Sequence, residues 1–223
     1  RHIISKSADI HFVICETYRK NLIKMGEEEK NIFNHGSLGI ENAMKFIKKV
    51  KSKNTTILTY HPETANSKFN WLSDFKKIYQ VLSKFKYKVI VTAPGHEKGS
   101  IQFIKEIKKI IKGNNKFNFI KSLGYKKYFS ILNNCAFVIG NSSSGIIEIP
   151  YYKIPTINIG DRQKGRFCHA SIINTKCNTK KIFNAIKLSQ TSYFQEKLKR
   201  MKLYFGKGNS SKNIVKTLEN FHK

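Results

Sequence analysis

Short apolar segments alternate with longer amphipathic segments from residue 56 to residue 189, and this alternation constrains the fold more than any other feature of the sequence. The apolar segments predict strands at 56–60, 88–92, 117–121, 137–140, 156–159 and 171–174. The intervening segments predict helices at 68–85, 100–111, 125–134, 144–152 and 179–189. The strand segments are apolar at consecutive positions, which is typical of strands buried on both faces. We therefore predict an α/β protein with a Rossmann-like parallel sheet and helices on both faces.

The segments outside this region suggest how the chain is divided. Residues 1–50 carry two short strand-like runs, at 11–15 and 31–33, among helical segments, and the charged stretch 51–54 follows them. Two further helices are predicted, at 193–204 and 210–221. We place a domain boundary near residue 51 and predict three parts: residues 1–50, residues 51–192, and a C-terminal helical part, residues 193–223, that packs back towards the first. Because the sequence begins at Arg1, in the middle of an apparent helix, we expect it to be a fragment.

Composition excludes several classes of function. The net charge is +28, from 42 basic and 14 acidic residues, but the lysines are spread over the whole chain and arginine is scarce. Nucleic-acid-binding surfaces concentrate arginine and aromatic residues in one place, so we expect no nucleic-acid partner. No apolar run approaches the length of a membrane span, so we expect no membrane association. The four cysteines have no metal-ligand spacing, which indicates a reduced, cytoplasmic setting without a metal.

The stretch from Phe137 to Glu148 carries the clearest functional pattern. An apolar strand ends at Gly140, Asn141-Ser142-Ser143-Ser144 follows, and Ser144 to Glu148 resembles the start of a helix. Backbone N–H groups and the positive end of a helix dipole would then point the same way, with serine hydroxyls beside them, which favours an anion. Glu148 would lie about one turn into the helix, where its carboxylate could accept hydrogen bonds from a diol. The alternative is a serine N-cap on an ordinary helix.

Other polar groups follow the neighbouring strands. In a doubly wound sheet, ligands bind beyond the carboxyl ends of the strands, so the residues found there should converge on one edge. They are His61-Pro62, Pro94-Gly95-His96, Ser122-Leu123-Gly124, Asn141 to Ser144, and Gly160-Asp161-Arg162. Small, polar and cationic groups at one edge of the sheet predict a site for a phosphorylated ligand.

Four stretches of this sequence together resemble the hydrolysing UDP-N-acetylglucosamine 2-epimerases that serve sialic acid or related nonulosonate synthesis. They are Ile57 to Pro62, Gly140 to Glu148, Pro155 to Arg166, and Gly206 to Ser211. The most specific is the strand followed by Gly-Asp-Arg-Gln-Lys-Gly-Arg, which no common fold requires. The resemblance implies the second half of a glycosyltransferase-B fold, in which two Rossmann-like domains face each other. It also implies that the residues assigned to proton transfer at the sugar lie mostly in the first domain, so we expect this chain alone to be inactive.

The resemblance also implies roles for individual residues and no cofactor. It places His61 at the diphosphate or the sugar, as the one catalytic residue in this half. Ser142 and Ser143, beside Asn141, would bind phosphate, Glu148 would bind the ribose hydroxyls, and Arg162 would lie near the phosphates. Leu123 and Gly124 would face the uracil. In the family, UDP leaves by elimination across the first two carbons of the sugar, and water then adds to give N-acetylmannosamine. The full-length enzyme is expected to be a homo-oligomer.

One loop departs from the family pattern. The family usually has Asn after the proline of the second predicted strand, in a Pro-Asn-x-Asp-like turn, whereas Gly95 follows Pro94 here and Glu97 stands in the place of the Asp. Recognition of the sugar therefore stays open between N-acetylglucosamine and a 4-acetamido-deoxy analogue on the route to legionaminic-type acids. A non-catalytic sugar-nucleotide binding module is a further alternative. His96 borders this loop and has both a ligand-binding and a structural interpretation.

Overall fold

The computed structural model describes residues 2–50, 52–63, 70–95 and 99–221, and the chain divides into two compact units. The large unit comprises residues 47–201, and the small unit comprises residues 1–46 and 202–223. His96 and the start of the helix predicted at residue 68 lie outside the described residues.

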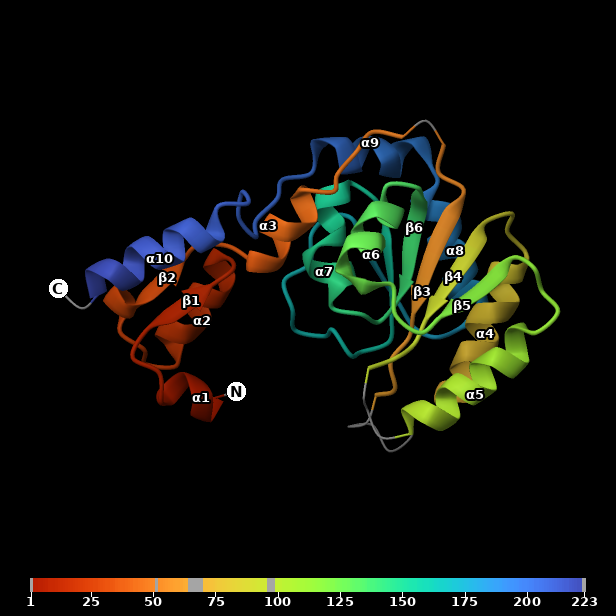
Figure 1. Ribbon diagram of the computed structural model, residues 1–223, viewed down its shortest axis with the longest axis horizontal. Helices are drawn as coiled ribbons and strands as arrows, with labels where there is room; N and C mark the ends of the chain where they lie inside the picture. The colour runs from red at the N-terminus through yellow and green to blue at the C-terminus, as the bar shows by residue number, and fades with distance from the viewer. Residues whose placement is uncertain (1, 51, 64–69, 96–98, 222–223) are drawn as a thin grey trace. The chain divides into compact units, whose positions relative to one another are not determined.

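The large unit is built on one six-stranded parallel sheet (Figure 1). Its strands are β3 (Thr55–Thr59), β4 (Lys88–Thr92), β5 (Phe117–Ile120), β6 (Cys135–Gly140), β7 (Thr156–Ile159) and β8 (Ile172–Thr175). They lie in the order β5-β4-β3-β6-β7-β8, so the chain runs outward from β3 to one edge and then from β6 to the other. This is the Rossmann order, and it places a topological switch point between β3 and β6. The predicted parallel sheet is confirmed.

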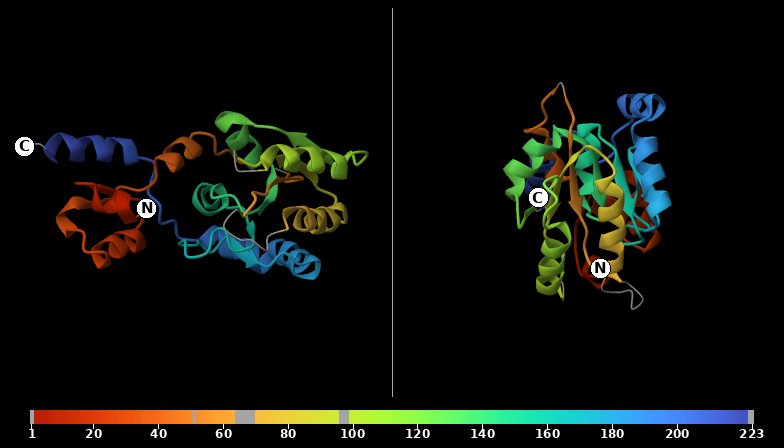
Figure 2. Two further views of the ribbon diagram at one scale, coloured as in Figure 1. Left: turned by 90° about the horizontal axis from the view of Figure 1, so that it is seen from below. Right: turned by 90° about the vertical axis from the view of Figure 1, so that its right-hand side faces the viewer.

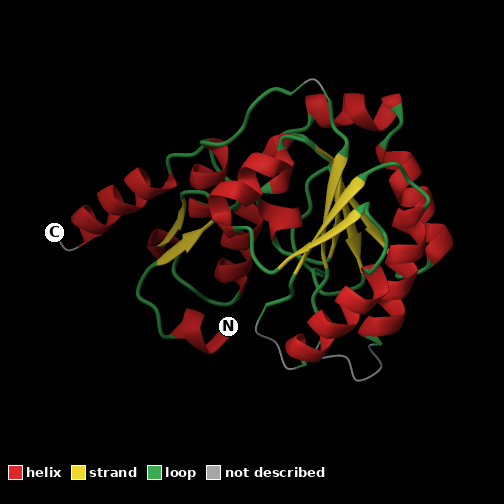
Figure 3. Cartoon of the chain, turned by 45° about the vertical axis from the view of Figure 1, so that its right-hand side comes forward, coloured by secondary structure: helices red, strands yellow, loops and turns green. Residues whose placement is uncertain are grey.

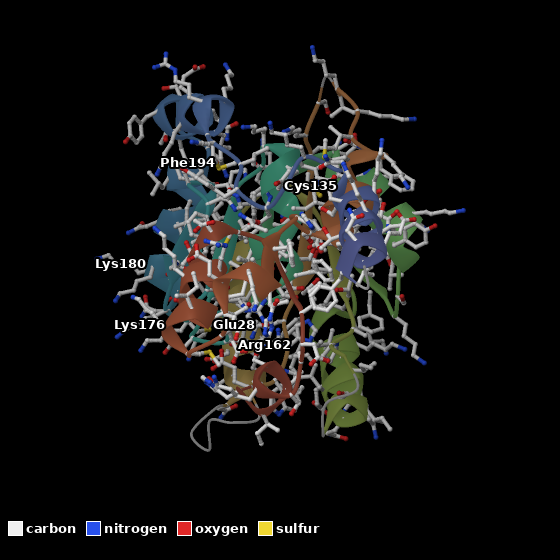
Figure 4. The ribbon with its side chains drawn as sticks, turned by 90° about the vertical axis from the view of Figure 1, so that its left-hand side faces the viewer. Glu28, Cys135, Arg162, Lys176, Lys180 and Phe194 are labelled. Atoms are coloured by element: carbon white, nitrogen blue, oxygen red, sulfur yellow. The ribbon has the colours of Figure 1, made fainter. Side chains whose placement is uncertain are left out.

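Helices cover both faces of this sheet (Figures 2 and 3). They are α4 (Trp71–Ser83), α5 (Ser100–Ile111), α6 (Gly124–Leu132), α7 (Ser144–Ile147), α8 (Thr179–Ser189) and α9 (Ser192–Arg200). Apolar side chains of α4, α5 and α8, among them Phe75, Phe103 and Ile182, join strand residues in one buried cluster. Lysines lie on the outside, as Lys176 and Lys180 show in Figure 4. Among the described helices, none has the length and apolarity needed to cross a membrane.

The helix predicted at 144–152 is shorter than expected. α7 ends at Ile147, and a 3-10 helix, η2 (Ile149–Tyr152), follows it. Pro150 has no N–H to donate to an α-helical ladder, which accounts for the early end of α7. A single helical turn adds up few peptide dipoles, so the macrodipole expected at this point is weaker than the sequence suggests.

The small unit contains a two-stranded parallel sheet of β1 (His11–Val13) and β2 (Ile32–Asn34). Its helices are α1 (His2–Lys6), α2 (Glu16–Lys24), the 3-10 helix η1 (Glu29–Asn31), α3 (Leu38–Met44) and α10 (Ser210–Phe221). Glu41 of α3 caps α10, because its carboxylate accepts hydrogen bonds from Ser211 N at 2.9 Å and Ser211 Oγ at 2.6 Å. α9 lies in the large unit and α10 in the small unit.

Gly140 ends β6 at the switch point, where the backbone of β3 passes very close. Its φ is +134°, and a Cβ at this position would lie 1.9 Å from Thr59 O. A side chain here would therefore push apart the two central strands of the sheet.

We expect Gly140→Ala to lower the free energy of unfolding by about 3 kcal/mol or more, because backbone atoms of β3 cannot yield to the added methyl group. Gly113→Ala is the matched control. Gly113 also has a positive φ, +82°, but nothing lies within 4 Å of its Cβ position, so the backbone strain alone should cost about 1 kcal/mol. Urea unfolding of both variants measures the difference, and equal losses would contradict this account.

Candidate functional site

Two adjoining cavities lie at the carboxyl edge of the sheet in the large unit. The first, the serine cavity, has a volume of about 390 Å³ and is lined by Leu123, Gly124, Ser142, Ser143 and Glu148, among others. The second, the His61 cavity, has a volume of about 740 Å³ and is lined by His61, Pro94, Gly95 and residues of α5. Ala93, Lys121 and Ser122 line both cavities. The structure thus brings together residues that follow four different strands.

The turn after β6 presents backbone donors to the serine cavity. Within the described part of the chain, the N–H groups of Ser142 and Ser143 make no hydrogen bond, and both side chains are partly exposed. Ser142 Oγ accepts a hydrogen bond from Ser144 N at 3.4 Å. Because α7 is a single turn, anion binding here would depend on individual N–H and O–H donors more than on a helix dipole.

Ser144 connects Glu148 to a tyrosine of α6. The Tyr128 hydroxyl donates to Ser144 Oγ at 3.0 Å, and the Ser144 hydroxyl in turn forms a hydrogen bond with the Glu148 carboxyl. Burial raises the pKa of Glu148 above the ordinary value of 4.5, while the bond from Ser144 partly opposes that rise. Burial likewise raises the pKa of Tyr128, so its hydroxyl keeps its proton and remains a donor. Tyr128, Ser144 and Glu148 all line the serine cavity, so this polar group borders the space where a ligand would lie.

Asn141 is fully buried, and its side chain is used inside the protein. Its Oδ1 accepts from His61 N at 2.7 Å, and its Nδ2 donates to His61 O at 2.9 Å. Its backbone carbonyl accepts from Arg162 Nη1 at 3.1 Å and from Gln163 Nε2 at 2.8 Å. The bonds to His61 use the Asn141 side chain within the protein, and the substrate contact expected of Asn141 stays a prediction. The side chain joins the chain after β6 to the chain after β3.

His61 and Arg162 lie outside the serine cavity. His61 borders the His61 cavity, and its Nδ1 accepts a hydrogen bond from Gly95 N at 3.2 Å. Arg162 lies in the loop after β7 and is exposed, with one guanidinium N–H on the Asn141 carbonyl. The sequence brings both residues to the correct edge of the sheet, but only the structure shows that they flank the serine turn.

Sequence reasoning assigned no individual role to three residues that shape the site: Tyr128, Gln163 and Ser144. Gln163 lies in the Gly-Asp-Arg-Gln stretch that the sequence had already marked, and its burial next to a strand end was the missing information. Tyr128 lies on a helix that gives no local sign of facing a cavity. No group of three or more His, Cys, Asp or Glu residues that could hold a metal ion occurs among the described residues.

Strand order, switch point and a donor-lined cavity define a Rossmann-type protein whose site suits an anionic ligand. The chain matches the family model of UDP-N-acetylglucosamine 2-epimerase over residues 1–219. It is 38% identical over 191 residues to the GDP/UDP-N,N'-diacetylbacillosamine 2-epimerase (hydrolyzing) of Campylobacter jejuni, covering 80% of this chain and 50% of that protein. It is 32% identical to the polysialic acid biosynthesis protein P7 of Escherichia coli, covering 100% and 60%.

Solved structures agree on the fold. The Staphylococcus aureus MnaA–UDP structure superposes with a TM-score of 0.78 at 16% identity, covering 99% of this chain and 63% of that one. The Methanocaldococcus jannaschii UDP-GlcNAc 2-epimerase in complex with UDP-GlcNAc and UDP gives 0.73 at 18% identity, covering 96% and 61%. The chain belongs to the UDP-N-acetylglucosamine 2-epimerase family, and the predicted fold class is confirmed. It spans about half of the first of these curated relatives and 60% of the second.

His169 contacts α7, the helix that follows the serine turn. It is buried, its ring forms a hydrogen bond with the backbone of Ile146 in α7, and it packs edge-on against Tyr151 and Phe167. Burial lowers the pKa of His169 from 6.5 to about 4, and the charge of Lys153 also lowers it, so the folded protein holds this ring neutral at pH 7.

This lowered pKa makes stability depend on pH. Below pH 6.5 the unfolded chain takes up a proton on His169 that the folded chain refuses until about pH 4, so stability should fall across that range. We expect a loss of about 2–3 kcal/mol that is absent in His169→Gln, beyond losses common to both proteins. Urea unfolding at pH 7 and pH 4.5 tests this. A wild-type loss no larger than that of the variant would contradict it.

Proposed function

We propose that this chain supplies the UDP-binding half of a hydrolysing UDP-N-acetylglucosamine 2-epimerase. The observation that carries the proposal is the serine cavity. The N–H groups of Ser142 and Ser143 lie at the switch point and make no hydrogen bond among the described residues, and Glu148 lines the same cavity. A nucleoside diphosphate needs both kinds of group, since its phosphates require donors and its ribose diol requires an acceptor.

The lining of the cavity suggests a position for each part of UDP. The N–H and O–H groups of Ser142 and Ser143 would donate to the phosphates, and Glu148 would accept from the ribose hydroxyls. Leu123 and Gly124 also line the serine cavity, where the chain after β5 enters α6, and their backbone groups would pair with the polar edge of uracil. Arg162 and His61 would approach the diphosphate from the flanks.

In the proposed reaction, the bond from the anomeric carbon to the diphosphate breaks as the proton on the second carbon is removed. Water then adds across the resulting double bond, so that UDP-N-acetylglucosamine and water yield UDP and N-acetylmannosamine. The diphosphate gains negative charge as it leaves. Oriented donors therefore stabilise the transition state more than the ground state, which is how a binding site contributes to rate.

The names of the relatives leave two candidates for the sugar. The Neisseria meningitidis relative, 30% identical over 198 residues, is named UDP-N-acetylglucosamine 2-epimerase. The Campylobacter jejuni and Legionella pneumophila relatives are named for N,N'-diacetylbacillosamine. The second candidate is therefore a 4-acetamido-deoxy sugar, and the 38% identity to the Campylobacter protein supports it. We further propose that the full-length enzyme is a cytoplasmic homo-oligomer serving sialic acid or related synthesis, and that this chain alone releases no UDP.

UDP titration of the purified chain tests the proposal. We expect saturable binding that Ser142→Ala weakens about threefold to tenfold, since one hydrogen bond to a charged group is lost. Glu148→Ala should weaken it about tenfold through loss of the ribose contact. Ser130→Ala is the matched control, because Ser130 lies on α6 outside the cavity and its hydroxyl donates to Lys126 O. A folded chain that binds no UDP by calorimetry would contradict the proposal.

The raised pKa of Glu148 predicts a pH dependence of UDP binding. On acidification, this carboxyl takes up a proton at a higher pH than an ordinary glutamate and becomes a weaker acceptor for ribose hydroxyls. The affinity of the wild type for UDP should therefore fall with decreasing pH more than that of Glu148→Gln, in which residue 148 does not titrate. Comparing the two proteins in parallel titrations cancels the protonation of UDP itself. Parallel pH profiles would show that Glu148 does not contact the ligand.

A further inference from the structure

Two sets of hydrogen bonds hold His61, one at its backbone and one at its ring. On one side the Asn141 side chain bonds both the N–H and the C=O of the His61 backbone, at 2.7 Å and 2.9 Å. These bonds continue the pairing of β3 with β6 beyond the last strand residues, because Asn141 N also donates to Thr59 O at 3.1 Å. Only one orientation of the Asn141 amide satisfies both contacts, with Oδ1 on the N–H and Nδ2 on the C=O. The backbone of His61 is thus fixed by a side chain that is itself fully buried.

On the other side, the loop after β4 holds the ring. Gly95 N lies 3.2 Å from His61 Nδ1, and a backbone N–H can only donate, so Nδ1 must present its lone pair. A neutral imidazole carries its single proton on the other nitrogen, Nε2. The Gly95 peptide is also fixed at its carbonyl, which accepts from Ser100 Oγ at 2.8 Å at the start of α5. The loop therefore sets which ring nitrogen carries the proton.

We propose that Asn141 and Gly95 are positioning residues that hold His61 as its Nε2–H tautomer, so that the ring acts as a hydrogen-bond donor from Nε2. A hydrogen-bond donor at Nε2 suits a departing diphosphate. The ring is not arranged to act as a base, because Nε2 carries the proton and Nδ1 already accepts the Gly95 N–H. The donor role rests on the proposed function. The tautomer does not, because it follows from contacts within the chain. Gly95 departs from the family pattern in its side chain. The group that contacts His61, however, is the backbone N–H of Gly95.

The tautomer can be tested without any ligand. The ¹⁵N resonances of histidine-labelled protein, recorded where the ring is neutral, distinguish protonated from unprotonated ring nitrogens. We expect wild-type His61 to show a protonated Nε2 and an unprotonated Nδ1. Gly95→Pro removes the N–H and should yield a mixture of tautomers, whereas Gly95→Ala keeps the N–H and should match the wild type. Asn141→Ala should also give a mixture, by releasing the His61 backbone.

Two results would overturn the tautomer assignment. The first is a wild-type ring protonated on Nδ1, which needs no variant and so remains decisive even if Gly95→Pro does not fold. The second is a folded Gly95→Pro protein with the same ring resonances as Gly95→Ala. A role for Gly95 or Asn141 in stability alone would leave the ring nitrogens unchanged in the folded variants.

The donor role is tested by a pair of substitutions. Glutamine can place an amide N–H near the position of Nε2, whereas asparagine reaches only the position of Nδ1. We expect His61→Gln to bind UDP within about threefold of the wild type and His61→Asn to bind about tenfold more weakly. Equal affinities of the two variants would overturn the donor role. If the wild type binds no UDP, the proposed function fails while the tautomer result stands on its own.

Discussion

The hydrogen-bonded contact between β3 and β6 is the interaction on which the rest of this structure depends. Gly140 lets the two backbones approach, and the Asn141 side chain extends their pairing by two residues along the chain after β3. From this seam the chain diverges in both directions, to β4 and β5 on one side and to β7 and β8 on the other. A crevice forms between the connections that leave this contact in the two directions. The contact between β3 and β6 therefore also creates the space for a ligand.

Charge alone cannot account for the specificity expected of this site. A net charge of +28 favours anions in general, and dispersed lysines do not select one anion over another. The serine turn provides what the lysines lack, because its N–H groups are fixed in direction by the backbone. Under the proposed function, Glu148 would add a second filter, because a carboxylate beside bound phosphates repels anions that offer it no hydroxyl. Selectivity for a nucleotide would then arise from one acceptor among many donors.

Local sequence patterns predict most of the helices and strands of the large unit, but they do not predict the geometry of the site. β4, β7, α5 and α8 begin and end where the sequence predicts, because consecutive apolar residues and helical spacing are strong there. α7 is shorter because Pro150 interrupts the ladder, which the apolar pattern alone does not show. The residues that follow strands were predicted to lie at the carboxyl edge of the sheet, and Ser142, Glu148 and His61 line cavities there. The orientation of Asn141 was not predictable, since local sequence does not show that its amide faces the backbone of a residue 80 positions away.

The same limit explains why the loop after β4 was hard to interpret from sequence. A family sequence pattern records side chains. Because Gly95 has no side chain, a glycine at this position suggests from the sequence that a contact has been lost. The structure shows that the peptide N–H still makes a contact, and a backbone donor is indifferent to the residue type that carries it. The side chains of this loop can therefore change while its backbone continues to hold His61. Under the proposed function, recognition of the sugar and orientation of the histidine would then be separable properties of one loop.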